Sequence, residues 1–164
     1  MPRIYLETRI SAPIEIVFDL SRSIDLHKIS TEHTKEEAIA GKTSGLIALG
    51  ETVTWRAKHL GFTQNLTSKI TDYNYPFFFA DEMIQGAFKE FRHEHLFERH
   101  ENTTLMIDVF TYQSPLGFFG KLADFVFLKK YLSNLLERRN LIIKDFAESE
   151  KWQKVLKEKK PDKS

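Results

Sequence analysis

Alternating apolar and polar residues predict a series of β-strands between residues 3 and 113. Trp55 and Ala57 share one face of such a segment, and Arg56 and Lys58 share the other, which is the two-residue period of a half-buried strand. Comparable segments predict strands at residues 3–10, 37–41, 51–59, 62–73, 77–84, 88–99 and 103–113. Short turns, such as those at Gly61 and at residues 85–87, join several of them, so consecutive strands should pair antiparallel.

Apolar side chains spaced three or four residues apart predict two short helices after the first strand and a long one near the end of the chain. Ser11 can cap the first short helix and Pro13 suits its first turn. Residues 25–30 predict the second short helix, and residues 118–157 the long one. Arg139 interrupts the stripe of the long helix. The apolar positions of that stripe are Phe118, Leu122, Phe125, Leu128, Leu132, Leu135, Ile142 and Phe146.

This order of elements predicts an α+β fold in which a curved antiparallel sheet of about six to seven strands wraps around the C-terminal helix. A long amphipathic helix needs a large apolar surface, and the concave face of the sheet is the one available. A strongly curved sheet cannot touch a straight helix along its whole length, so we expect a cavity between them. Gly41, Gly45 and Gly50 punctuate one connection, where we expect a mobile lid. We expect one ligand-binding domain over residues 1–148 and a helix end with a frayed Lys-rich tail over residues 149–164.

The amino-acid composition excludes several classes of function. The chain has 164 residues, of which 41% are apolar and 29% charged, with a formal net charge of +1, which is typical of a globular protein without a general attraction to nucleic acid. There is no cysteine, which excludes disulfides and thiolate chemistry and fits a cytoplasmic location. No signal peptide or membrane span is evident, because the most apolar stretch, 122–128, is short and contains Asp124. The sequence also lacks the phosphate-binding, nucleophile-elbow and zincin motifs.

The sharpest chemical feature is the pair His93 and His95. Residues two apart on a strand point to the same face, and Phe91 and Phe97 flank the pair on that face. We therefore expect both imidazoles to point into the interior.

The following strand can supply an acidic partner. If its hairpin turns at residues 101–102, His95 lies opposite Asp108 and His93 opposite Phe110. That register turns Asp108 inward, where an imidazole and a carboxylate relieve each other's cost of burial. A slip by one residue would turn an apolar set, including Leu105 and Ile107, inward instead.

Three interpretations of the group formed by His93, His95 and Asp108 stay open. It can be a hydrogen-bonded network in a mixed core, a polar anchor for the head group of a bound ligand, or a site of catalysis or metal binding. We assign no metal, no cofactor and no firm catalytic residue. The other histidines, His27, His33 and His100, are predicted to lie at the surface, and the adjacent Asp81 and Glu82 must face opposite ways.

Four segments resemble the START-like, Bet v 1-like superfamily, also called SRPBCC or helix-grip proteins. They are residues 11–18 (SAPIEIVF), 53–59 (VTWRAKH), 81–98 (DEMIQGAFKEFRHEHLFE), and 108–112 together with 115–117. The last three are similar to a bacterial subgroup of ligand-binding members, some of them connected with cell division. The resemblance covers roughly residues 3–148 and implies a pocket for an apolar ligand such as a lipid, a sterol, a polyketide or an aromatic compound, although some members are enzymes.

We therefore predict a carrier or sensor that binds a small hydrophobic molecule between the sheet and the C-terminal helix. The alternatives are an enzyme of the cyclase or hydratase type with His93 or His95 as acid–base, and an interaction module linked to cell division. Phenylalanines on both faces of residues 77–79 also suggest a second covered surface or a homodimer contact. The predicted ligand-binding residues are Trp55, His59, Phe79, Phe91, His93, His95, Phe97, Met106, Asp108, Phe110, Tyr112, Phe125 and Leu132.

Overall fold

A computed structural model describes residues 1–114 and 127–157 of the chain. It contains seven strands, β1 (Arg3–Ile10), β2 (Glu37–Gly41), β3 (Thr52–His59), β4 (Phe62–Asn74), β5 (Phe78–Gln85), β6 (Glu90–His100) and β7 (Thr103–Gln113). Its helices are α1 (Ile14–Ser21), α2 (Ile24–Ser30), the 3-10 turn η1 (Glu32–Thr34), α4 (Lys129–Ala147) and α5 (Trp152–Leu156). The predicted α+β class is confirmed.

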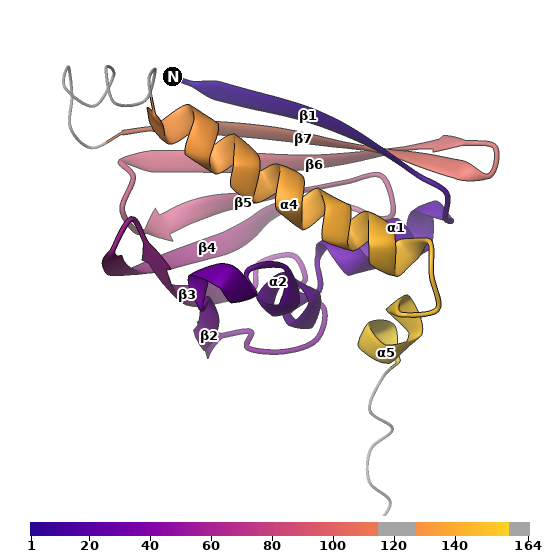
Figure 1. The fold of residues 1–164 in the computed structure, drawn as a ribbon, viewed down its shortest axis with the longest axis horizontal. Coiled ribbons are helices and arrows are strands. Elements are labelled where there is room, and N and C mark those ends of the chain that lie inside the picture. The colour runs from indigo at the N-terminus through magenta and orange to yellow at the C-terminus, as the bar shows by residue number, and fades with distance from the viewer. Residues whose placement is uncertain (115–126, 158–164) are drawn as a thin grey trace, which may run out of the picture.

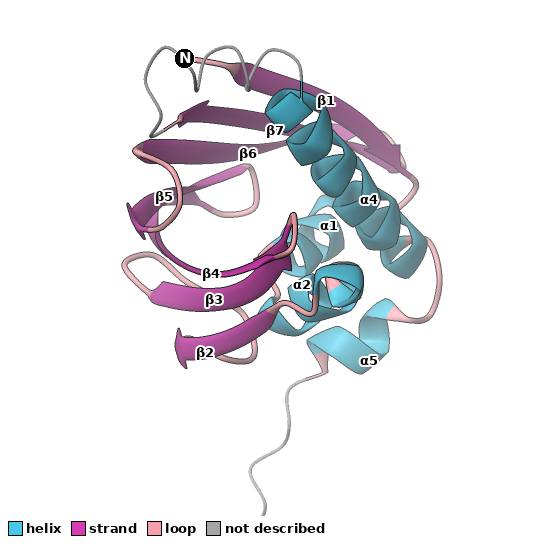
Figure 2. Cartoon of the chain, turned by 60° about the vertical axis from the view of Figure 1, so that its left-hand side comes forward, coloured by secondary structure: helices cyan, strands magenta, loops and turns pink. Residues whose placement is uncertain are grey.

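The strands form one open antiparallel sheet in the order β1-β7-β6-β5-β4-β3-β2. The sheet curves around α4, which crosses its concave side diagonally (Figures 1 and 2). Its two edges are β1 and the short β2, whose pairing with β3 is interrupted by a bulge between Ala38 and Ala40. The predicted helix-grip arrangement, with two short helices after the first strand, is therefore confirmed.

The pairing of β6 with β7 confirms the predicted register. His95 lies opposite Asp108, His93 opposite Phe110, and Phe97 opposite Met106. Asp108 is completely buried, and the exposed fractions of His93 and His95 are 7% and 3%. Both imidazoles and the carboxylate thus belong to the interior of the protein.

The space between sheet and helices is filled at one end and hollow at the other. At the filled end, Phe18 of α1 is fully buried and makes edge-to-face contacts with the rings of Tyr73, Phe79 and Phe97. Ile143 and Ala147 from the second half of α4 complete this core. Leu132 and Leu136 of the first half of α4, and Leu128 just before it, belong instead to a separate cluster with Phe91 and Phe110.

The C-terminal region differs from the expected continuous helix and frayed tail. The helix breaks after Ala147, and Trp152, Val155 and Leu156 of α5 pack against the core. Their spacing of one and three residues puts them on one face of a short helix, which explains why this segment docks. The N-terminal part of the expected helix, with Phe118, Leu122 and Phe125, and the tail over 158–164 lie outside the described residues.

The glycine-punctuated connection between β2 and β3 does not form the expected lid. Gly45 accepts a hydrogen bond from the amide of Ile24 and donates one to the Asp25 carboxylate, and Ile47 is buried in the core. At Gly41, which has a φ of 72°, a Cβ atom would lie 2.3 Å from the carbonyl oxygen of Thr52, so this close approach requires glycine. The connection is tied to α2 and does not line the cavity described below.

Candidate functional site

A cavity of about 450 Å³ lies between the concave face of the sheet and the first half of α4. Apolar side chains form most of its wall, and they come from β3, β4, β6, β7 and α4. The principal apolar residues are Trp55, Ala57, Leu66, Phe88, Phe91, Phe110, Leu128, Leu132, Leu135 and Leu136. The predicted hollow beneath the helix is therefore present, and it lies at the end of the sheet that α1 does not cover.

The predicted site residues fall into two groups. Trp55, His59, Phe91, His93, Phe110 and Leu132 line the cavity. Phe79, His95, Phe97, Met106, Asp108 and Tyr112 are not part of its wall and are buried in the packing around it. The physical reason is position along the strands: Phe79, Phe97 and Met106 lie under α1, whose side chains fill the space. Phe125 lies outside the described residues.

Asp108 is the centre of a buried polar network that joins β6 and β7 to α4. Nε2 of His93 donates to Oδ1 of Asp108 at 2.8 Å, and Nδ2 of Asn140 donates to Oδ2 at 2.7 Å. Nη1 of Arg139 lies 3.4 Å from the same carboxylate, and Nη2 donates to the backbone carbonyl of Ser21 at 3.0 Å. The network therefore links the sheet, α4 and the end of α1.

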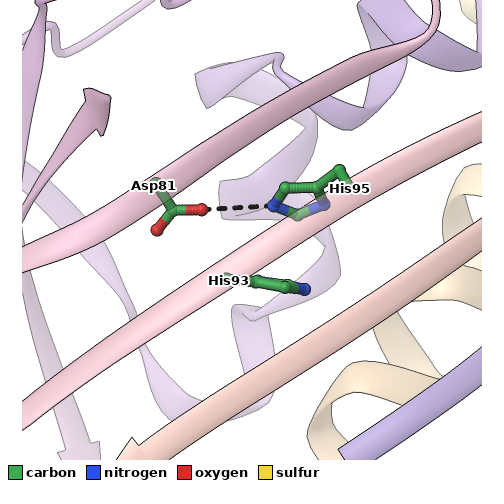
Figure 3. Close-up of side chains that lie close together, drawn as sticks. All are labelled: Asp81, His93 and His95. Atoms are coloured by element: carbon green, nitrogen blue, oxygen red, sulfur yellow. Dashed lines mark hydrogen bonds and ion pairs between the residues drawn. The ribbon is translucent and has the colours of Figure 1, made fainter. Parts of the chain in front are cut away.

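His95 lies between two carboxylates. Its Nε2 is 3.1 Å from Oδ1 of Asp81 (Figure 3), and its Nδ1 is 3.2 Å from Oδ1 of Asp108, although the angle at Nδ1 is not that of a hydrogen bond. The ring also stacks on Phe79, with 4.1 Å between ring centroids. These contacts fix the imidazole in the core, while Asp81 itself lines the cavity.

Burial and neighbouring charges act in opposite directions on the ionisable groups. Burial lowers the pKa of His93 to about 4, and the adjacent His95 adds to this effect, so that they outweigh the nearby carboxylates. Burial alone would raise the pKa of Asp108, but the hydrogen bond from His93, the adjacent His95 and the charge of Arg139 hold it well below its usual range. The pKa of Asp81 is lowered for similar reasons, chiefly by its hydrogen bond with His95 against the effect of burial. At neutral pH the site thus contains ionised carboxylates and a neutral His93.

Asp81, His93 and His95 are also the group of potential metal ligands that the described residues bring together (Figure 3). Their ligand atoms lie within 4.8 Å of one another. His95 already contacts Asp81, His93 already contacts Asp108, and the cationic Arg139 adjoins the same carboxylate. In this arrangement the three residues take part in a hydrogen-bonded network.

A second polar group lies in another part of the cavity wall. His59 Nδ1 is 2.9 Å from the hydroxyl of Tyr131, and Nε2 of His27 is 3.2 Å from Glu36. The His27 ring lies on Trp55 with 4.2 Å between centroids. His27 lines the cavity and is therefore not the surface histidine that we expected, because its ring lies against Trp55 and contacts Glu36. His33 and His100 are exposed as predicted.

Several residues of the site were not predicted from the sequence. Arg139 and Asn140 stand on the buried side of α4, and Asp81 faces inward while Glu82 pairs with Arg92 on the other face. The interruption of the apolar stripe at Arg139 was the available signal, since a buried guanidinium needs an acidic partner. The sequence contains no comparable signal that Leu66, Phe88 or Tyr131 line the cavity.

The site and the sheet together define a helix-grip protein with an apolar cavity, and the comparisons with known proteins agree on the fold. No protein-family model matches the sequence, and no curated protein matches it. Among solved structures, TTHA0849 from Thermus thermophilus is similar with a TM-score of 0.68 and 18% identity, covering 87% of this chain and 97% of that one.

Two further solved structures have the same fold. Major latex-like protein 151 from Panax ginseng matches with a TM-score of 0.67 and 14% identity, and a START superfamily protein from Mycobacterium smegmatis with 0.67 and 12%. Each match covers 89% of this chain and 97% of the other. The chain thus has the Bet v 1-like, START-like fold that the sequence resemblance implied. No helix in the described part of the chain is long and apolar enough to cross a membrane.

Proposed function

We propose that the protein binds a small, largely apolar molecule in the cavity between the sheet and α4, as a carrier or sensor. The observation that supports this most directly is the cavity itself, which has the volume and the apolar lining typical of a ligand site. The leucines and phenylalanines of the wall have no protein side chains packed against them on the side that faces the cavity. A ligand would supply these packing contacts, whereas the other end of the sheet is closed by the protein's own side chains.

The polar residues of the wall would orient such a ligand. His93, Asp81 and Arg139 form one polar side, and His59 with Tyr131 forms another. A few convergent polar groups in an apolar cavity fix the direction in which an amphipathic molecule enters. The ligand that we propose therefore has an apolar body, of the lipid, polyketide or aromatic type, and at least one polar group.

Filling the cavity should abolish binding without unfolding the protein. Ala57 is buried on β3 and lines the cavity, so in the variant Ala57→Phe the added ring should occupy the ligand's space. We expect the Kd of the fluorescent apolar probe N-phenyl-1-naphthylamine to rise at least about tenfold, which corresponds to roughly 1.4 kcal/mol. The thermal midpoint should change little, because the ring enters a void and not a packed core.

Ala40→Phe is the matched control, since Ala40 is exposed on the edge strand β2. It adds the same side chain outside the cavity and should bind the probe like the wild type. If the unmodified protein does not bind the probe, and native mass spectrometry finds no retained ligand after exposure to a lipid extract, the proposal is wrong.

Acid–base catalysis and a role as an interaction module stay untested hypotheses. Of the two histidines considered for catalysis, only His93 lines the cavity, and its Nε2 is bonded to Asp108. A homodimer likewise stays a prediction; Phe77 is 48% exposed at the edge of the core, and Phe79 is buried.

A further inference from the structure

The turn between β3 and β4 exposes apolar side chains where a polar turn would be more stable. His59 pairs directly with Phe62, so the loop has two residues, Leu60 and Gly61, with φ angles of 53° and 85°. Two positive φ angles in a two-residue hairpin loop favour Asn-Gly, and leucine is strained there. Leu60 is nevertheless 53% exposed and Phe62 71% exposed, so neither side chain compensates by burial.

This turn lies at the mouth of the cavity. Leu60 and Phe127 both line the cavity, and His59 bonds to Tyr131 of α4. Phe127 is 56% exposed and stacks on Tyr131. The β3–β4 turn, the β5–β6 turn and the first turn of α4 all lie at the left-hand end of the molecule in Figure 1. Leu60 and Phe127 therefore form an exposed apolar rim at this end of the cavity, and the exposed Phe62 lies beside them opposite His59.

The rim is also basic. We define it as residues 58–62, 87–90 and 127–130, which contain four lysines and one acidic residue, Glu90. The lysines, all exposed, are Lys58, Lys89, Lys129 and Lys130. The chain as a whole has a net charge of only +1, so positive charge is concentrated at this end.

We infer that this rim docks on the surface of a lipid bilayer that contains anionic phospholipids. Exposed leucine and phenylalanine side chains can enter the boundary between head groups and acyl chains, and lysines around them attract anionic head groups. Docked in this way, the mouth of the cavity would face the bilayer, from which an apolar molecule could pass without crossing water. Docking itself does not require a ligand in the cavity, so it can be tested apart from the proposed function.

Vesicle co-sedimentation tests the inference with the unmodified chain. We expect binding to phosphatidylcholine vesicles with about 30 mol% phosphatidylglycerol at about 0.1 M salt, and binding at least about tenfold weaker to pure phosphatidylcholine or at about 0.5 M salt. Absence of binding to the anionic vesicles overturns the inference, whether or not N-phenyl-1-naphthylamine binds.

Leu60→Asn separates docking from folding. Asparagine suits the positive φ at this position, so the thermal midpoint should rise or stay unchanged while vesicle binding falls about fivefold or more. The double variant Lys129→Gln, Lys130→Gln should lose binding to anionic vesicles to a similar degree. Leu141→Gln is the matched control, because Leu141 is 63% exposed on α4 outside the rim, and it should bind like the wild type.

Two further results would contradict the inference. One is vesicle binding by Leu60→Asn equal to that of the wild type. The other is a dimer in light scattering that Leu60→Asn converts to a monomer, with no vesicle binding by either form; the rim would then be a contact between two copies of the chain.

Discussion

Asp108→Ala is expected to lower the free energy of unfolding by about 3–5 kcal/mol, the largest effect of any single substitution in the polar network. Asp108 is completely buried and is the carboxylate that faces the guanidinium of Arg139 at 3.4 Å. Alanine would leave that cation buried without its acidic partner, and it would also remove the acceptor used by His93 and Asn140. An uncompensated buried charge costs far more than the side-chain volume lost.

Urea denaturation of Asp108→Ala, of a surface control, and of the cycle formed by Asp108→Leu, Arg139→Met and their double variant measures this effect and isolates its cause. Asp145→Ala is the surface control, because the ion pair of Asp145 with Lys151 is exposed, and it should change stability by less than about 1 kcal/mol. The double variant Asp108→Leu, Arg139→Met removes both charges and should be less destabilised than the sum of the two single changes. Additive losses, or a loss below about 1 kcal/mol for Asp108→Ala, would show that the two charges are not coupled.

Acidification from pH 7 to about 4 should remove about 3 kcal/mol of stability through His93. Burial holds the pKa of His93 at about 4 in the folded protein, against 6.5 for a free imidazole. Between these values the unfolded chain binds a proton that the folded protein does not, so stability falls as the pH falls. At about 1.4 kcal/mol per pKa unit, the whole difference amounts to about 3 kcal/mol.

His93 and the carboxylates change the free energy of unfolding in different pH ranges, so their contributions can be distinguished. The pKa values of Asp81 and Asp108 are lowered, so their ionised forms stabilise the fold above the usual carboxyl range and are lost only below about pH 4. Free energies of unfolding at several pH values between 4 and 7 should therefore give a steep slope for the wild type and a shallower one for His93→Gln. His100→Gln, at an exposed histidine, should keep the wild-type slope. Equal slopes for wild type and His93→Gln would mean that the pKa of His93 is the same in the folded and the unfolded protein.

The register of β6 and β7 could be predicted from the sequence because alternation has only two outcomes. One register places Asp108 beside the histidines, and the other places it in solvent. Phe91 and Phe97 fixed the inner face of β6, and the polar partner needed by two buried imidazoles favoured Asp108 as the inner residue of β7. The structure has this register.

The contribution of α4 to the site could not be predicted in the same way. A stripe of apolar residues shows which side of a helix is buried, but not where along the sheet each turn of the helix lies. Arg139 and Asn140 reach Asp108 because the middle of α4 crosses β7 near that residue, and the crossing depends on how α1 and α2 pack. Asp81 faces inward because it lies opposite His93 in the regular pairing of β5 with β6.

The sequence also could not predict which inward-facing residues line the cavity and which are packed in the core. Phe79 and Phe91 both belong to inward-facing positions of the sheet, but Phe79 contacts Phe18 of α1 and Phe91 borders the cavity. Alternation predicts that a side chain is buried, not whether a neighbouring element fills the space beside it. That difference separates the predicted residues that line the cavity from those that lie in the core.

The open sheet has a consequence for the behaviour of the protein at high concentration. An unpaired edge strand can recruit another chain and start aggregation. Here β2 has only five residues and a bulge, and β1 carries the exposed charges Glu7 and Arg9. Lys144 of α4 also donates to the backbone carbonyl of Arg9. Both edge strands are thus poor templates for intermolecular β-pairing. The protein should therefore resist aggregation at high concentration even though its sheet is open.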